Sequence, residues 1–144
     1  KRTGMRATFE ICAKNADKPP LTFFEIKRTI DQFQNDESWM LTSAGRFSEK
    51  VEMFPNSVFI IGADTLLRVF DEKFYKSHKD MMEHIERFND HNINFLVFGR
   101  KVNNKFISLD KIKVPEIIKS RCTGFEEASF RDDISSTELR LIKD

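Results

Sequence analysis

The chain has 144 residues, of which 40% are hydrophobic and 33% are charged, with only five glycines and four prolines. This composition excludes the collagen-like, low-complexity and disordered classes, and the length predicts one domain over residues 1–144. A net charge of +1 excludes a global field for holding nucleic acid or an anionic membrane. The longest apolar run, residues 58–61, is far shorter than the about 20 residues of a membrane helix.

The two cysteines, Cys12 and Cys122, lie far apart in the sequence, and neither has a CxxC neighbour. One disulfide is possible on paper, but the spacing implies no disulfide framework, metal site or redox site. No signal peptide is visible. We therefore expect reduced thiols and a cytoplasmic protein.

Apolar periodicity predicts that strands and helices alternate along the chain. Residues 7–14 are expected to form a strand that ends before the double proline at 19–20. Residues 21–34 are expected to form a helix, with Thr22 as its N-cap and Glu25 as the capping-box partner. We interpret the phenylalanines of this helix as core residues, because their side chains carry no polar atom.

The middle of the chain continues the alternation. A short strand is expected at 38–42 and a short helix at 47–54. The apolar run at 57–62 predicts a strand that is covered on both faces. One helix is expected to begin at 63–65. A second, long helix is expected over 71–89.

In the last part of the chain we expect one further buried strand at 94–99, a hairpin-like turn at Asn103 and Asn104, and the start of a last helix at 133–141. Strands that alternate with helices favour a parallel sheet with helices on both faces. We therefore predict an α/β fold: a three-layer α/β/α Rossmann-like domain with a mostly parallel sheet.

The residues that follow each strand are candidates for a binding site, because ligands bind beyond the carboxyl ends of parallel strands. Asp17 and Lys18 follow the first strand, Gly62 and Asp64 end the third, and Arg100 follows the fourth. We expect these groups to converge on one edge of the sheet. The alternatives are that Asp64 caps the next helix and that the basic residues lie on the surface.

A second candidate site is the start of the last predicted helix. Ser135, Ser136 and Thr137 present hydroxyls and free backbone N–H groups together, which suits an anion. Arg140 follows within one turn, and its guanidinium can bind a phosphate through two hydrogen bonds. The alternative is an ordinary helix N-cap.

Two of these segments carry a resemblance to a known family. Residues 134–140 (ISSTELR) resemble the ISSTxxR motif of the nucleotidylyltransferase superfamily, and residues 60–66 (IIGADTL) resemble the IIGADxL segment of its nicotinate-nucleotide adenylyltransferase branch. The two occur in the family's order, and the resemblance extends over most of the chain from about Ala7. It implies nucleotide-binding roles for Gly62 and Asp64 at the nucleoside, and for Ser135, Ser136, Thr137 and Arg140 at the triphosphate.

The resemblance also implies a reaction. An adenylyl or cytidylyl group would pass from a nucleoside triphosphate to a small phosphorylated acceptor, with release of pyrophosphate and with Mg²⁺ as cofactor. Catalysis in such enzymes is mainly positioning and charge stabilisation. The expected partners are therefore the triphosphate and the acceptor. Binding to nucleic acid or to a membrane is not expected. No metal ligand in the chain is assigned.

The sequence departs from the superfamily at its most characteristic segment. The GxFxPxHxGH-type turn after the first strand is absent, and the three histidines, His78, His84 and His91, lack HxGH or TxGH spacing. We expect His78 to be packed on the apolar stripe of residues 71–89 and His84 to pair with Asp80 on the helix surface. No catalytic residue is therefore assigned.

This departure leaves two alternatives. In the first, the chain is the C-terminal part of a longer protein that carries the missing segment upstream of Lys1. In the second, the chain is a non-catalytic nucleotide-binding or regulatory domain that has kept the fold but lost the segment.

Overall fold

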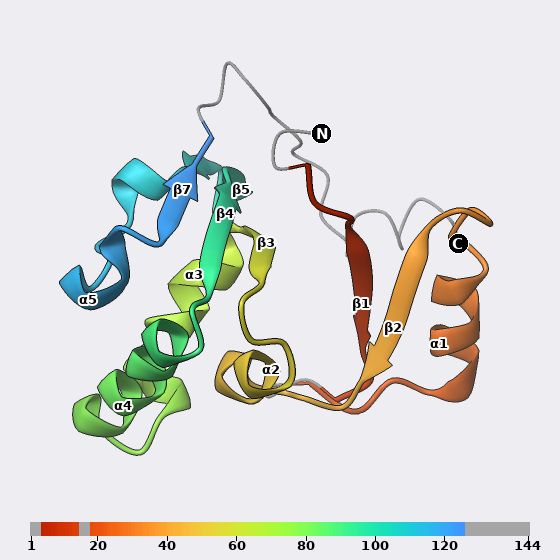
Figure 1. Ribbon diagram of the computed structural model, residues 1–144, viewed down its shortest axis with the longest axis horizontal. Helices are drawn as coiled ribbons and strands as arrows, with labels where there is room; N and C mark the ends of the chain where they lie inside the picture. Colours follow the sequence, from red (N-terminus) through yellow and green to blue (C-terminus); the bar gives the residue numbers. More distant parts are fainter. Residues whose placement is uncertain (1–3, 15–17, 126–144) are drawn as a thin grey trace. The chain divides into compact units, whose positions relative to one another are not determined.

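The computed structural model describes residues 4–14 and 18–125 (Figure 1). They form a mixed α/β structure with parallel strands, as the alternation predicted. The chain divides into two compact units between Lys50 and Val51. No helix in the described part of the chain has the length and apolar character needed to cross a bilayer.

The first unit contains two parallel strands and the helix that connects them (Figure 1). Its elements are β1 (Thr8–Cys12), α1 (Phe23–Ile30) and β2 (Ser38–Thr42). The predicted capping box of the helix is confirmed: Glu25 N–H donates to the Thr22 hydroxyl, and Thr22 N–H donates to the Glu25 carboxylate over 2.7 Å. These local bonds explain why the helix begins directly after Thr22.

The phenylalanines of residues 21–34 are not all core residues, so that interpretation is corrected. Phe23 and Phe24 are 75% and 81% exposed, whereas Phe33 packs between Phe9 and Trp39, with ring centroids 5.1 and 6.4 Å away. A sheet of two strands offers only a narrow face, and no residue of α1 is buried.

The second unit is built around a three-stranded parallel sheet of order β3-β4-β7 (Figure 1). Helix α2 (Phe47–Met53) spans the boundary between the units. The strands and helices that follow it are β3 (Val58–Gly62), α3 (Ala63–Val69), α4 (His78–Asp90), β4 (Asn94–Phe98), β5 (Arg100–Val102), β6 (Lys105–Ile107), α5 (Glu116–Lys119) and β7 (Cys122–Gly124). Two short 3₁₀ helices lie at Glu72–Phe74 and Leu109–Lys111.

The core of the second unit lies on one face of this sheet. Leu66 of α3, Ile85 and Phe88 of α4, and Phe95 and Val97 of β4 are all at most 1% exposed. In contrast, Ile60 in β3 is 60% exposed. The expectation that residues 57–62 are covered on both faces is therefore wrong within the described chain.

The long helix predicted over residues 71–89 is also corrected. It is divided into the 3₁₀ turn at Glu72–Phe74 and α4, which begins at His78. Ser77 causes the new start: its hydroxyl accepts a hydrogen bond from the Asp80 N–H over 3.1 Å. Apolar periodicity continues through such a break, because it records which face is buried and not where the backbone is capped.

The hairpin predicted around Asn103 and Asn104 is confirmed. β5 and β6 pair in antiparallel fashion, and both asparagines have positive φ angles, 48° and 61°. Two such residues form the turn whose twist matches that of the flanking strands. The hairpin follows β4 directly and so carries Arg100 at the carboxyl end of that strand.

Candidate functional site

The carboxyl ends of β3 and β4 meet at one edge of the sheet. Gly62, the last residue of β3, is in register with Phe98, the last residue of β4. Asp64 lies two residues beyond Gly62 in the first turn of α3, and Arg100 lies two residues beyond Phe98 at the start of β5. Parallel pairing therefore brings three of the residues predicted to bind a ligand to the same edge, as expected.

Gly62 is the centre of this arrangement because it has no side chain. A β-carbon at position 62 would contact Asp64 Oδ1 and would lie 3.0 Å from Arg100 Cγ and 3.2 Å from Arg100 Nε. The backbone of Gly62 is extended, with φ −79° and ψ 154°, so any residue could adopt its conformation. A side chain at position 62 would therefore have to displace the Asp64 and Arg100 side chains that occupy this space.

The alternative role of Asp64 as a helix cap is not what the structure shows. Gly62 occupies the N-cap position of α3, without a capping side chain, and Asp64 lies inside the first turn. A carboxylate there is stabilised by the partial positive charge of the helix start. Asp64 is also exposed, so its oxygens are accessible to hydrogen-bond donors of a ligand.

The remaining predicted site residues belong to the first unit or lie outside the described residues. Lys18 is exposed and belongs to the first unit. Five residues lie outside the described residues: Asp17, Ser135, Ser136, Thr137 and Arg140. The predicted helix at 133–141 lies there too, so its anion site stays a prediction.

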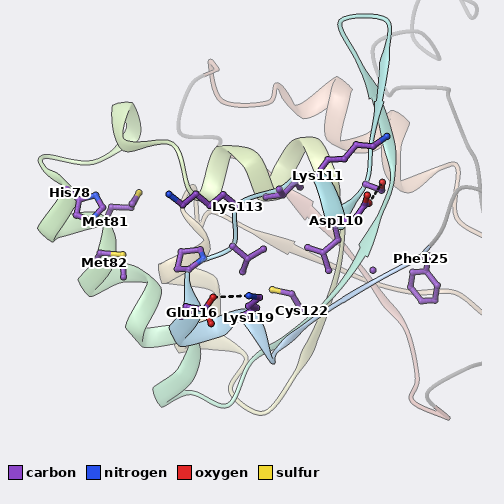
Figure 2. Close-up of a pocket in the computed structure, with 16 residues that line it drawn as sticks. His78, Met81, Met82, Asp110, Lys111, Lys113, Glu116, Lys119, Cys122 and Phe125 are labelled. Carbon is purple, nitrogen blue, oxygen red and sulfur yellow. Dashed lines mark hydrogen bonds and ion pairs between the residues drawn. The ribbon is translucent and has the colours of Figure 1, made fainter.

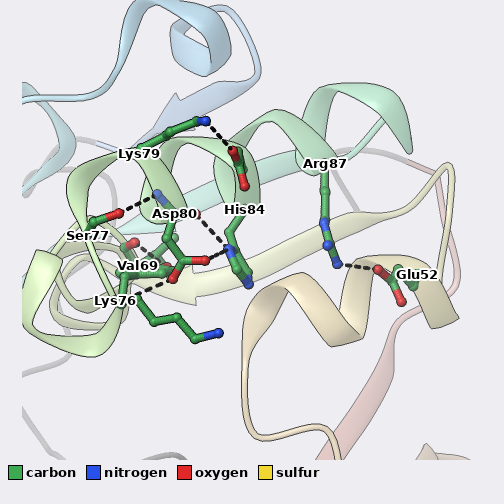
Figure 3. A network of polar contacts seen from close by, with 10 residues as sticks. Glu52, Val69, Lys76, Ser77, Lys79, Asp80, His84 and Arg87 are labelled. Atoms are coloured by element: carbon green, nitrogen blue, oxygen red, sulfur yellow. Dashed lines mark hydrogen bonds and ion pairs between the residues drawn. The ribbon is translucent and has the colours of Figure 1, made fainter.

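The three histidines are all engaged on α4 or at its end. His84 Nδ1 lies 2.7 Å from the Asp80 carbonyl oxygen and 3.6 Å from Asp80 Oδ1, which confirms the predicted pair (Figure 3). His91 Nδ1 lies 2.9 Å from a carbonyl one turn earlier. His78 is not packed as expected: its side chain is 67% exposed, and Nδ1 lies 2.5 Å from Glu72 Oε1.

A pocket of about 1250 Å³ lies in the second unit, between the start of α4 and the segment before α5 (Figure 2). Its apolar lining is provided mainly by Met81, Met82, Leu109, Ile112, Val114 and Pro115. Its charged lining is provided by His78, Asp110, Lys111, Lys113, Glu116 and Lys119. No motif in the sequence predicted this pocket, although residues 111–114 alternate lysine with aliphatic residues.

Cys122 also lines the pocket, but it is a poor nucleophile near neutral pH. Burial raises the pKa of its thiol from 9.0 to about 11, and the thiolate is the reactive form. Cys12 and Cys122 are both free thiols in the structure.

The described residues contain no group of three His, Cys, Asp or Glu side chains that could hold a metal ion. Comparisons with protein-family models, curated proteins and solved structures found no match to this chain. The assignment of a function therefore depends on the sequence motifs and on the geometry at the carboxyl edge of β3 and β4.

Proposed function

We propose that this chain is a nucleotidylyltransferase-like domain with a three-layer Rossmann-like fold, which binds a nucleoside triphosphate at the carboxyl edge of β3 and β4. One observation carries the proposal: Gly62, Asp64 and Arg100 come together at that edge. In open α/β sheets, this edge is where ligands bind.

Each of the three residues has a chemical role in the proposal. The missing side chain of Gly62 leaves room for the Asp64 and Arg100 side chains at this edge. The Asp64 carboxylate accepts hydrogen bonds from ribose hydroxyls, and the Arg100 guanidinium brings positive charge to the same edge for a phosphate. Ser135, Ser136, Thr137 and Arg140 complete the site by holding the triphosphate, as the resemblance implies.

In the proposed reaction, an adenylyl or cytidylyl group moves to a small phosphorylated acceptor and pyrophosphate leaves. No cluster of three acidic, histidine or cysteine side chains that could hold a metal ion occurs among the described residues. Mg²⁺ is commonly held by substrate phosphates with one or two carboxylates, so in this proposal the ion arrives with the triphosphate. The cytoplasm, where nucleotides occur and thiols stay reduced, is the proposed location.

A second candidate is a domain that binds the nucleotide without chemistry. The histidines favour it, because His84 and His91 bond to carbonyls of α4 and His78 pairs with Glu72. None of them stands in the HxGH spacing that the superfamily uses at the reacting phosphates.

Thermal unfolding with ATP or CTP tests binding. A ligand that binds only the native state raises the melting temperature, and a rise of several degrees at saturating nucleotide is expected. Asp64→Asn and Arg140→Ala should each abolish the rise. Asp90→Asn, at an exposed position at the end of α4, is the matched control and should retain it.

The absence of a rise with either nucleotide, in a protein that unfolds cooperatively, would refute both candidates. Given a rise, pyrophosphate release separates them. Release with a panel of phosphorylated acceptors, lost in Arg140→Ala, supports the transferase. Binding without release from any acceptor supports the non-catalytic domain.

A further inference from the structure

We propose that the pocket between α4 and residues 108–116 binds a small amphipathic carboxylate, a molecule with an apolar body and one negative charge. The proposal does not depend on nucleotide binding, because it uses none of Gly62, Asp64 and Arg100. It rests on the apolar lining of the pocket and on the balance of its charges.

The apolar lining is extensive enough for the body of such a ligand. Met81 and Ile112 are 5% and 8% exposed, and Met82, Leu109 and Val114 are half-buried. Methionine side chains are flexible and polarisable, so they adapt to apolar ligands of different shape. The volume of about 1250 Å³ exceeds what a ligand of this size needs.

The two acidic groups of the pocket are both engaged by other residues that line it. The Ser108 hydroxyl donates to Asp110 Oδ1. The Lys119 ammonium lies 2.8 Å from Glu116 Oε1, and this ion pair is visible at the edge of the pocket (Figure 2). Lys119 therefore balances the charge of Glu116, whereas Asp110 keeps its negative charge.

The lysines leave one positive charge unbalanced. The pocket lining contains three lysines, Lys111, Lys113 and Lys119. It contains two acidic residues, Asp110 and Glu116. Lys111 Nζ donates to the Phe106 carbonyl over 3.0 Å.

Lys113 is the group that remains for a ligand. Within the described part of the chain, its ammonium has no hydrogen-bond or ion-pair partner. It extends toward the part of the pocket where His78 and Met81 lie (Figure 2), although His78 is already paired with Glu72. An ammonium beside an apolar surface binds a carboxylate through a charge-assisted hydrogen bond, and one excess charge matches a monoanion.

The test uses methionine methyl NMR with octanoate as the probe. Met81 and Met82 line the pocket, whereas Met5, Met40 and Met53 do not. Octanoate should shift the methyl resonances of Met81 and Met82 in a saturable way and leave the other three unchanged. Met5 and Met53 are 60% and 53% exposed, so they report non-specific adsorption.

Two variants and two analogues complete the test. Lys113→Met should weaken octanoate binding about tenfold, the loss expected for one charge-assisted hydrogen bond. Lys101→Met makes the same change at an exposed lysine outside the pocket. It should change the affinity for octanoate by less than about twofold. Octanol and octylammonium should bind more weakly than octanoate.

Three results would overturn the proposal. They are the absence of Met81 and Met82 shifts at millimolar octanoate, equal shifts at all five methionines, and binding that is the same for octylammonium or for Lys113→Met. Both lysine variants change exposed side chains, so both proteins should fold. The first two results are obtained with the unmodified protein.

Discussion

Arg100 packs against the backbone of Gly62, so closely that a β-carbon at position 62 would lie 3.0 Å from Arg100 Cγ. The two residues are distant in the sequence and are joined by the pairing of β3 with β4. The glycine thus provides the space in which the arginine side chain lies beside Asp64.

Gly62→Val tests this relationship. Adding three carbons to a filled space should destabilise the protein by about 1–3 kcal/mol and should displace Asp64 and Arg100. Urea unfolding measures the first effect, and the nucleotide-induced change in melting temperature measures the second. Thr123→Val, at an exposed strand position of the same sheet, should change stability by less than about 0.5 kcal/mol. Equal stability of the two variants would contradict the packing argument.

A second prediction concerns the ion pair inside the first unit. Lys50 Nζ lies 2.6 Å from Glu10 Oε2, and the Lys50 side chain is only 10% exposed; Thr42 donates to the other Glu10 oxygen over 2.5 Å. Glu10→Ala leaves a buried ammonium without a partner and should cost about 3 kcal/mol of unfolding free energy, measured by urea titration. Glu116→Ala removes an exposed pair and should cost at most about 1 kcal/mol. A similar cost for both would show that burial of Lys50 has no effect.

The third prediction follows from the raised pKa of the Cys122 thiol. Burial moves the pKa from 9.0 to about 11, so the native thiolate fraction at pH 8 is about a hundredfold lower than in the unfolded chain. Iodoacetamide should alkylate Cys122 about a hundredfold more slowly in native Cys12→Ser protein than in urea, as measured by mass spectrometry. Equal native and unfolded rates would be inconsistent with a buried thiol.

The same shift has a defined consequence for stability. The folded state keeps the Cys122 proton to higher pH than the unfolded state does, so the group's contribution to stability is complete below pH 9.0. It is lost as the pH rises through the folded pKa of about 11. Cys122→Ser in the same background should remove this part of the alkaline destabilisation.

The fourth prediction compares two phenylalanines of opposite burial. Phe95 is fully buried in β4, whereas Phe24 is 81% exposed in α1. Phe95→Ala should destabilise the protein by about 3–5 kcal/mol, and Phe24→Ala by less than about 0.5 kcal/mol. Circular dichroism during urea unfolding checks both. A large loss in Phe24→Ala would mean that α1 buries this side chain in solution.

Local features were predicted correctly from the sequence. The Thr22–Glu25 capping box and the Asn103-Asn104 turn each depend on a few neighbouring residues, and both are present. Parallel strands were predicted by their alternation with helices. The meeting of Gly62, Asp64 and Arg100 followed from that topology, because carboxyl ends of parallel strands share an edge.

Burial and the pocket could not be predicted in this way. Phe24 and Phe95 are the same residue type in two segments that were both predicted to contribute to the core, yet one is exposed and the other is buried. The pocket combines Met81 of α4 with Lys113, which lies more than thirty residues away in the sequence. Capping and turn formation depend on residues within a few positions of one another, which a sequence displays directly. Exposure and pocket lining depend on which distant elements cover a given face, and only the packing of the folded chain determines that.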